Sequence, residues 1–209
     1  MLGTHDLALF AATVFVLNAT PGVDMAYAVA STLRGGWRQG VAAALGIMSG
    51  CVLHTFAAAF GLAALLAASS EAFAVVKYVG AVYLLYVAWG MARAGLRPPA
   101  AVAEVAAPRS LWRTARQGFF TNALNPKVAL FFLALLPQFI AADAPSKTVS
   151  FLFLGAWFIV QGLLFLLALI ALVAPLRRSQ PRPWVGRGLN LGGAGLFTLL
   201  AAKLALTKP

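Results

Sequence analysis

The stretch "LNATPGVDMAY", from Leu17 to Tyr27, places a Pro21-Gly22 pair and the carboxylate of Asp24 inside a segment otherwise apolar enough to cross a bilayer. Proline has no backbone N–H and interrupts an α-helix, and a charge at the centre of a membrane helix costs about 2.5–3.5 kcal/mol on insertion scales. A second stretch, "TNALNPKVALFF" from Thr121 to Phe132, repeats this arrangement with Lys127 as its charge. We expect the two broken helices to face each other and to form the site.

The composition is that of an integral membrane protein. Of the 209 residues, 62% are hydrophobic and only 10% are charged, with a mean hydropathy of +0.88, whereas a soluble domain carries about 25% charged residues. The formal net charge is +11, but the basic residues lie in short loops between apolar runs, as in the cytoplasmic loops of membrane proteins. We therefore expect a lipid bilayer around the chain and no nucleic-acid partner.

Six apolar segments are long enough to cross a membrane, which takes about 20 residues in a helix. Their approximate limits are 7–33, 41–68, 72–92, 118–141, 148–174 and 188–206. The longest connection is an alanine- and arginine-rich linker, whose end could form a helix that starts at Ser110 and lies at the interface. The sequence thus predicts an N-terminal three-helix repeat in residues 1–92, a cytoplasmic linker in residues 93–117, and a C-terminal three-helix repeat in residues 118–209.

The two halves resemble each other in pattern. "NATPG" in the first span and "NALNP" in the fourth each place Asn-Ala shortly before a proline. With three spans in each half, the halves must cross the membrane in opposite orientations. Inverted repeats with broken helices in matching positions are typical of secondary transporters. The expected fold is an all-α integral membrane protein of six transmembrane helices, arranged as two inverted three-helix repeats with broken first and fourth helices.

The distribution of basic residues predicts the orientation of the chain. Most arginines lie in the loops after spans one, three and five, whereas the opposite side offers only four lysines near the membrane ends. The positive-inside rule places the arginine-rich loops in the cytoplasm. With six spans, both termini are then expected on the outer side of the membrane.

Asp24 and Lys127 are the residues best suited to bind a charged group. Asp24 is a plausible proton carrier, since surroundings of low polarity disfavour the charged form of a carboxylate. It could also cap the half-helix after Pro21-Gly22, where the positive end of the helix dipole attracts an anion. Lys127 could extend its ammonium group to the membrane surface, but its depth in the span favours a pair with Asp24 or with a substrate carboxylate.

The breaks themselves are assigned to Pro21, Gly22 and Pro126. Each proline leaves one backbone carbonyl unpaired a turn earlier in the chain, and nearby polar side chains can bond these carbonyls or a ligand. The polar side chains in reach along the sequence are Asn18, Thr20, Asn122 and Asn125. Their structural and ligand-binding roles stay equally open.

Gly46, Gly50 and His54 lie on one face of the second span. The Gly-x-x-x-Gly pair permits close helix contact. His54 is a candidate proton relay, although a hydrogen bond within the bundle is the simpler explanation. Glycine stripes could also support a homodimer. Two histidines and the single Cys51 are too few for a metal cluster, and the phosphate-binding loop motif is absent from the sequence, so we expect no metal, no cofactor and no enzyme activity.

Two long motifs resemble the signatures of the lysine-exporter (LysE/RhtB) superfamily. The first is "NATPGVDMAYAVASTLRGGWRQGVAAALGIMSGCVLH" and the second is "GFFTNALNPKVALFFLALLPQF", while "GAVYLLYVAWG" is similar to the third-span pattern. The resemblance covers nearly the whole chain. It implies a six-helix exporter of the homoserine/threonine type in the bacterial inner membrane, acting on amino acids or related metabolites and driven by the proton gradient.

The expected function is export of a small amino acid or close derivative from the cytoplasm in exchange for protons. Asp24 suits an ammonium group, and Lys127 with the half-helix N-termini suits a carboxylate. In the empty protein the two charges could neutralise each other. The alternatives are an exporter of another small metabolite or a cation on the same scaffold, and a non-transporting membrane assembly protein.

Overall fold

The computed structural model describes residues 3–63 and 110–175, with isolated positions between 75 and 96 and between 195 and 202. Within these residues, two helices are long and apolar enough to cross a membrane, and two bent helix pairs bring the number to four when each pair counts as one span. The predicted third and sixth spans lie almost entirely outside the described residues. The helical, membrane-type architecture is confirmed, and the six-span repeat layout stays a prediction.

The first span is broken where the sequence predicts it. Helix α1 (Leu7–Ala19) ends before Pro21, and helix α2 (Val23–Gly35) begins after Gly22 at an angle of 55° to α1. The break arises because the ring nitrogen of Pro21 carries no hydrogen for the carbonyl one turn back. It leaves Asp24 in the first turn of α2.

The fourth span is broken in the same way, between α6 (Leu111–Ala123) and α7 (Pro126–Ala134), which a short 3₁₀ turn, η2 (Leu136–Phe139), extends. The two parts meet at 48°. The hydroxyl of Ser110 accepts a hydrogen bond from the N–H of Arg113 at 3.3 Å, so Ser110 caps α6 as predicted. The predicted interfacial segment from Ser110 and the start of the predicted fourth span lie on this one continuous helix, and the limits of the linker and of the span stay predictions.

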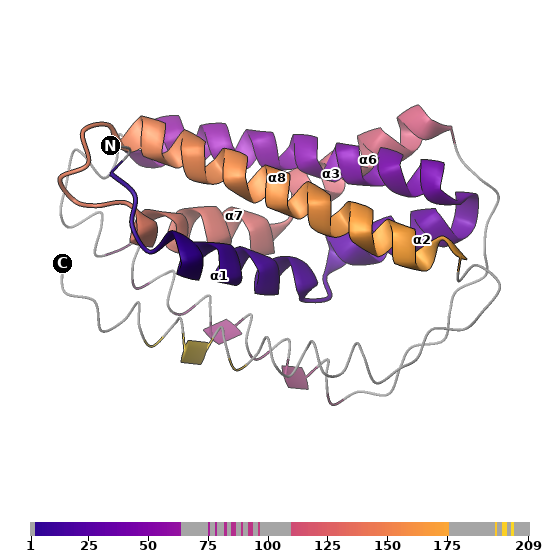
Figure 1. Ribbon diagram of the computed structural model, residues 1–209, viewed down its shortest axis with the longest axis horizontal. Coiled ribbons are helices and arrows are strands. Elements are labelled where there is room, and N and C mark those ends of the chain that lie inside the picture. The colour runs from indigo at the N-terminus through magenta and orange to yellow at the C-terminus, as the bar shows by residue number, and fades with distance from the viewer. Residues whose placement is uncertain are drawn as a thin grey trace.

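Two long helices form the frame of the bundle. Helix α3 (Trp37–Phe56) continues as a π-helical turn, η1 (Ala57–Leu62), and α8 (Lys147–Val173) is the predicted fifth span. Both run along the whole length of the bundle, whereas α1 and α7 lie toward one end and α2 and α6 toward the other (Figure 1). Both breaks therefore lie near the middle of the bundle.

Glycines bring the helix backbones of α3 and α6 into direct contact. A Cβ atom at Gly46 would overlap the carbonyl of Ala115, and one at Gly118 would lie 2.7 Å from the carbonyl oxygen of Ala43. On α8, Gly155 faces Thr55 and Gly162 faces Met48. The glycine stripes of α3 and α8 thus serve packing within the chain, and the homodimer stays a prediction.

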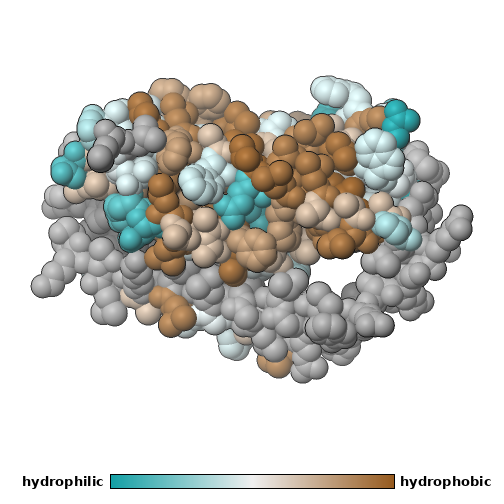
Figure 2. Space-filling model, viewed as in Figure 1, coloured by the Kyte–Doolittle hydropathy of each residue, from teal (hydrophilic) through white to brown (hydrophobic). Residues whose placement is uncertain are grey.

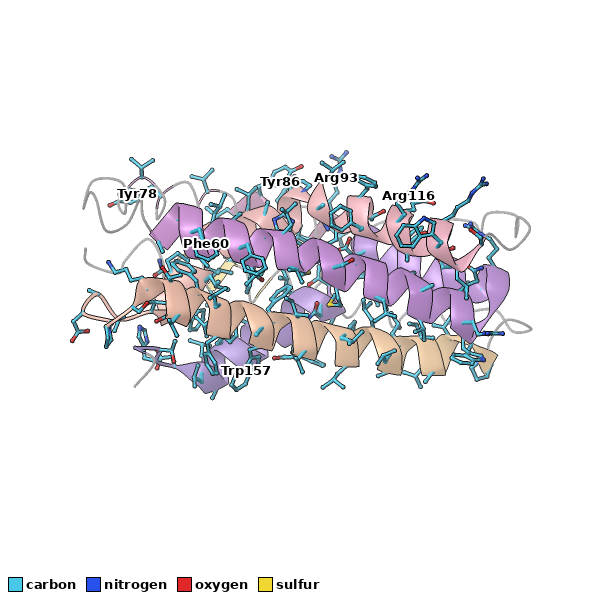
Figure 3. The ribbon with its side chains drawn as sticks, turned by 90° about the horizontal axis from the view of Figure 1, so that it is seen from above. Phe60, Tyr78, Tyr86, Arg93, Arg116 and Trp157 are labelled. Carbon is cyan, nitrogen blue, oxygen red and sulfur yellow. The ribbon has the colours of Figure 1, made fainter. Side chains whose placement is uncertain are left out.

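The outer surface is as apolar as a lipid-facing surface must be. Hydrophobic residues cover much of the described surface in Figure 2, and on α8 Leu164 and Leu172 are 62% and 69% exposed. Figure 3 shows Arg116 pointing away from the bundle and Trp157 on the side of α8 that faces α1. The side chain of Trp157 bonds Gln161, which in turn donates to the backbone carbonyl of Ala11 at 2.7 Å. Polar side chains within the bundle therefore join helices.

Candidate functional site

A small cavity of about 40 Å³ lies where the two breaks meet. From the breaks it is lined by Asn18, Thr20, Gly22, Asp24, Asn122, Asn125 and Lys127, and from α3 and α8 by Ile47, Met48, Cys51, Phe158 and Leu166. The structure thus brings seven of the predicted site residues together around one space. Pro21, Pro126 and His54 do not line it.

Asp24 is held by two amides from the other half of the chain. Its Oδ2 atom accepts a hydrogen bond from Asn122 Nδ2 at 2.8 Å and another from Asn125 Nδ2 at 3.0 Å. Asn122 and Asn125 are almost fully buried, at 1% and 4% exposed. Asn125 is also the N-cap of α7, where its Oδ1 accepts from the backbone N–H of Lys127 at 3.0 Å. One asparagine therefore has both the structural and the site role that the sequence left open.

Lys127 binds the end of α1 and not Asp24. Its Nζ donates to the backbone carbonyls of Leu17 at 2.9 Å and Thr20 at 3.1 Å. Leu17 lies four residues before Pro21, so its carbonyl is the one that the proline leaves without a helical donor. Between these described residues no direct ion pair is formed, although Asp24 and Lys127 are close enough to attract each other. The expected direct pair is therefore replaced by a bond between Lys127 and the carbonyls that end α1.

At the second break, His54 binds the backbone carbonyl that corresponds to the one Lys127 binds at the first break. Its Nε2 lies 3.1 Å from the carbonyl oxygen of Asn122, four residues before Pro126, and must donate because a carbonyl only accepts. The imidazole is buried and lies beside the ring of Phe132. The carbonyl of Asn122 also accepts from the backbone N–H of Asn125 at 2.8 Å. Each carbonyl that a proline deprives of its regular helical donor thus binds a side chain from another helix. His54 is linked to Asp24 through one residue, Asn122.

Three buried polar atoms at the cavity have no hydrogen-bond partner among the described residues. They are Asn18 Nδ2, Asp24 Oδ1 and Asn122 Oδ1. Leaving a buried polar group unpaired costs about 1–3 kcal/mol, and more for a charged group. Thr20 does not share this property, because its hydroxyl bonds the carbonyl of Val16 at 2.6 Å within α1. These three atoms are the polar groups through which the cavity could bind a further molecule.

Several contributors to the site went unrecognised in the sequence. The carbonyl of Leu17 could have been found, since it lies one turn before Pro21, but the wall residues Met48, Cys51 and Phe158 carry no local signal. Two hydrogen bonds outside the cavity also join helices α2, α3 and α6. Tyr27 donates to the carbonyl of Thr114 at 2.8 Å, and the hydroxyl of Thr114 donates to Gln39 at 2.5 Å.

Comparisons with known proteins point to one group of transporters. The family model described as "LysE type translocator" matches residues 15–208. The chain is 31% identical to an uncharacterised membrane protein of Pseudomonas aeruginosa, over 98% of this chain and 96% of that protein. It is 28% identical to the homoserine/homoserine lactone efflux protein of Salmonella typhimurium, over 92% of each, and 29% identical to the leucine efflux protein of an Enterobacter species, over 73% and 72%. No solved structure matches the chain.

Proposed function

The chain belongs to the LysE type translocator family, and on this premise we propose that it is a secondary exporter of an amino acid or a close derivative. The observation that carries the proposal is the bonded junction of Asp24 with Asn122 and Asn125, which joins the two broken spans around a cavity. The efflux proteins of Salmonella and Enterobacter support the substrate class by their names.

Asp24 is the group that would bind the ammonium of the substrate. One of its carboxylate oxygens accepts from two asparagine amides, which fix its position, while the other stays unpaired at the cavity. A buried carboxylate is stabilised most by a partner that brings both positive charge and N–H donors. An α-ammonium group has both properties.

The same carboxylate would couple transport to protons. A proton and an ammonium group compete for one oxygen, so Asp24 binds one or the other, and release of substrate leaves room for a proton. Antiport requires such exclusive binding. The site would change the side of the membrane to which it opens with substrate bound to Asp24, and would return with a proton bound to Asp24. Lys127 stays bound to α1 in this scheme and balances the charge of Asp24.

The breaks would allow the site to open alternately to the two sides of the membrane. Helices α3 and α6 are in backbone contact at Gly46 and Gly118 and would move as one body. The half-helices α1, α2 and α7 meet at breaks without regular backbone bonds, where a change of angle is least costly. We place the protein in the bacterial inner membrane with both termini on the outer side, and a homodimer would be compatible with this arrangement.

Reconstitution of the full chain into proteoliposomes tests the proposal. Labelled L-homoserine, L-leucine and other neutral L-amino acids are loaded one at a time, and counterflow is measured with and without an opposing proton gradient. Exchange of at least one amino acid, accelerated by the gradient, is the expected result. Flux of a metal cation alone would favour the cation exporter, and absence of any substrate-dependent flux would favour the assembly protein.

A further inference from the structure

Tyr27 connects α2 to α6 at one end of the bundle. Its hydroxyl donates to the backbone carbonyl of Thr114 at 2.8 Å. Thr114 precedes the cavity residue Asn122 by about two helical turns, which is about 12 Å along α6. Helices α2 and α6 both lie toward this end of the bundle (Figure 1). The bond therefore lies between the cavity and the end at which α2 turns into α3.

Four helices pack together around this bond. The hydroxyl of Thr114 donates to Gln39 of α3 at 2.5 Å, and both side chains are buried. A Cβ atom at Gly40 would overlap the hydroxyl of Thr32 on α2 and would lie 2.9 Å from the side chain of Ile170 on α8. Helices α2, α3, α6 and α8 thus meet between the cavity and this end, and α2 must move away from the others before a path can open there.

The opposite end of the bundle is held in a different way, by backbone hydrogen bonds. The N–H of His5 donates to the carbonyl of Phe139 at 3.1 Å, and the N–H of Ala141 donates to the carbonyl of Gly3 at 2.8 Å. The ring of Phe10 packs edge-on against Phe139. Paired main chains therefore join the two halves at this end, whereas a tyrosine hydroxyl joins α2 to α6 at the other.

The bond of Tyr27 joins a half-helix to a rigid pair of helices. Helices α3 and α6 are in backbone contact at Gly46 and Gly118, so Thr114 belongs to both. Helix α2 begins at the break, at 55° to α1, and carries Asp24 in its first turn. The carbonyl of Thr114 lies inside α6, where it can accept a helical bond as well. Opening the Tyr27–Thr114 bond therefore leaves this carbonyl paired.

We propose that the Tyr27–Thr114 bond holds α2 against α3 and α6 and so controls access to the cavity from this end. When the bond opens, α2 can turn about the break, and Asp24 moves with it. Tyr27 is not among the residues that line the cavity, so it acts as a positioning residue for Asp24. The inference rests on the proposed export function and names the contact that regulates its site.

Cys51 reports access to the cavity without any substrate. It is the single cysteine of the sequence, it lines the cavity, and it is 0% exposed. A thiol reagent can reach it only when the helices move apart, so its rate of modification follows the population of the open state. The test uses the full-length chain in inside-out and in right-side-out membrane vesicles. A membrane-impermeant, cationic methanethiosulfonate is added, and the modified fraction is followed by mass spectrometry.

Tyr27→Phe should make Cys51 react about three- to tenfold faster than in the native chain, because one hydrogen bond of ordinary strength no longer holds the closed state. The rise should occur from one side of the membrane only, the side of the turn between α2 and α3. An unchanged rate overturns the inference. An equal rise from both sides, or a rise from the opposite side alone, overturns it as well.

Two control variants separate the role of Tyr27 from a general loosening of the bundle. Tyr86→Phe makes the same chemical change at a side chain that is 71% exposed. Thr13→Val removes a buried hydroxyl that donates to the carbonyl of Leu9 at 2.7 Å within α1. Both variants should keep the native reactivity of Cys51. A rise in Thr13→Val as large as that in Tyr27→Phe would show that any lost hydroxyl bond loosens the bundle, and would overturn the inference.

Counterflow of the amino acids named above, measured in proteoliposomes on the same variants, distinguishes this inference from the export proposal. Tyr27→Phe should lower the KM on the side of the turn between α2 and α3, because more of the population is open to that side. A one-sided rise in Cys51 reactivity without counterflow in any variant supports the access role of Tyr27 and overturns export. Counterflow by the native chain, with Cys51 reactivity unchanged in Tyr27→Phe, supports export and overturns the access role.

Discussion

Asn122 donates a 2.8 Å hydrogen bond to Asp24 across 98 positions of the sequence and so joins the two broken spans at the ends of their half-helices. The opposite connection exists as well, because Lys127 of the second half binds the carbonyl of Leu17 in the first. At the first break, Lys127 from the second half therefore binds a backbone carbonyl, and at the second break Asn122 is bonded to Asp24 from the first half. A change of angle at one break must alter the hydrogen bonds at the other, which is the property expected of a site that opens alternately.

Asp24→Asn should abolish proton-coupled export while the protein still folds. The substituted amide has nearly the same shape, but it cannot carry the negative charge that binds a proton or an ammonium group. The measurement is uphill export from proteoliposomes under a proton gradient, with circular dichroism as the check on folding. Asp6→Asn is the matched control, since that carboxylate is half-exposed before α1 and far from the cavity in sequence. Uphill export by Asp24→Asn at the rate of the control would refute the assignment.

Asn125→Ser should separate the two roles of this residue. Serine is a good N-cap and can still accept from the N–H of Lys127, so the loss of stability should stay below about 1 kcal/mol. It cannot reach Asp24 with an amide, so the carboxylate loses one of its two donors and transport should fall. Denaturant unfolding and counterflow, measured on one preparation, give the two quantities. Full transport activity in this variant would mean that the bond from Asn122 is sufficient.

Lys127→Met should destabilise the fold through the carbonyls of Leu17 and Thr20. Each buried carbonyl left unpaired costs about 1–3 kcal/mol. Pro21→Ala supplies a backbone N–H that can pair with the carbonyl of Leu17, so Lys127→Met should cost less in that background. The double-mutant cycle is measured by denaturant unfolding and should show a coupling of about 1 kcal/mol. Strict additivity would indicate that Lys127 acts at a site other than this carbonyl.

Gly46→Ala should force α3 and α6 apart, because the added Cβ atom would overlap the backbone carbonyl of Ala115. Inserting a methyl group into a well-packed contact costs about 1–3 kcal/mol. Gly61→Ala is the control in the π-helical turn that continues α3, since no described atom lies within 4 Å of the place its Cβ atom would take, and little loss is expected. Equal unfolding temperatures for the two variants would contradict the close contact.

Local features of the fold could be predicted from the sequence because they depend on neighbouring residues. Pro21-Gly22 and Asn125-Pro126 break their helices, and Ser110 caps α6, each through a backbone donor or acceptor that lies within a few positions. The start of the fourth span at residue 118 stays a prediction, because α6 runs through that position without a break. Figure 3 shows Arg116, which lies within α6, pointing away from the bundle.

The partners of the charged residues were decided only by the tertiary structure. The sequence by itself determined that a carboxylate, a lysine and two prolines would lie inside apolar spans, and the costs of burial implied that they would be paired. From the charges alone, the sequence favoured an ion pair between Asp24 and Lys127. The crossing of the helices instead brings Asn122 and Asn125 to Asp24 and the end of α1 to Lys127. Which donor meets which acceptor depends on the register between helices about 100 residues apart, and side-chain packing along α3 and α8, not local propensity, sets that register.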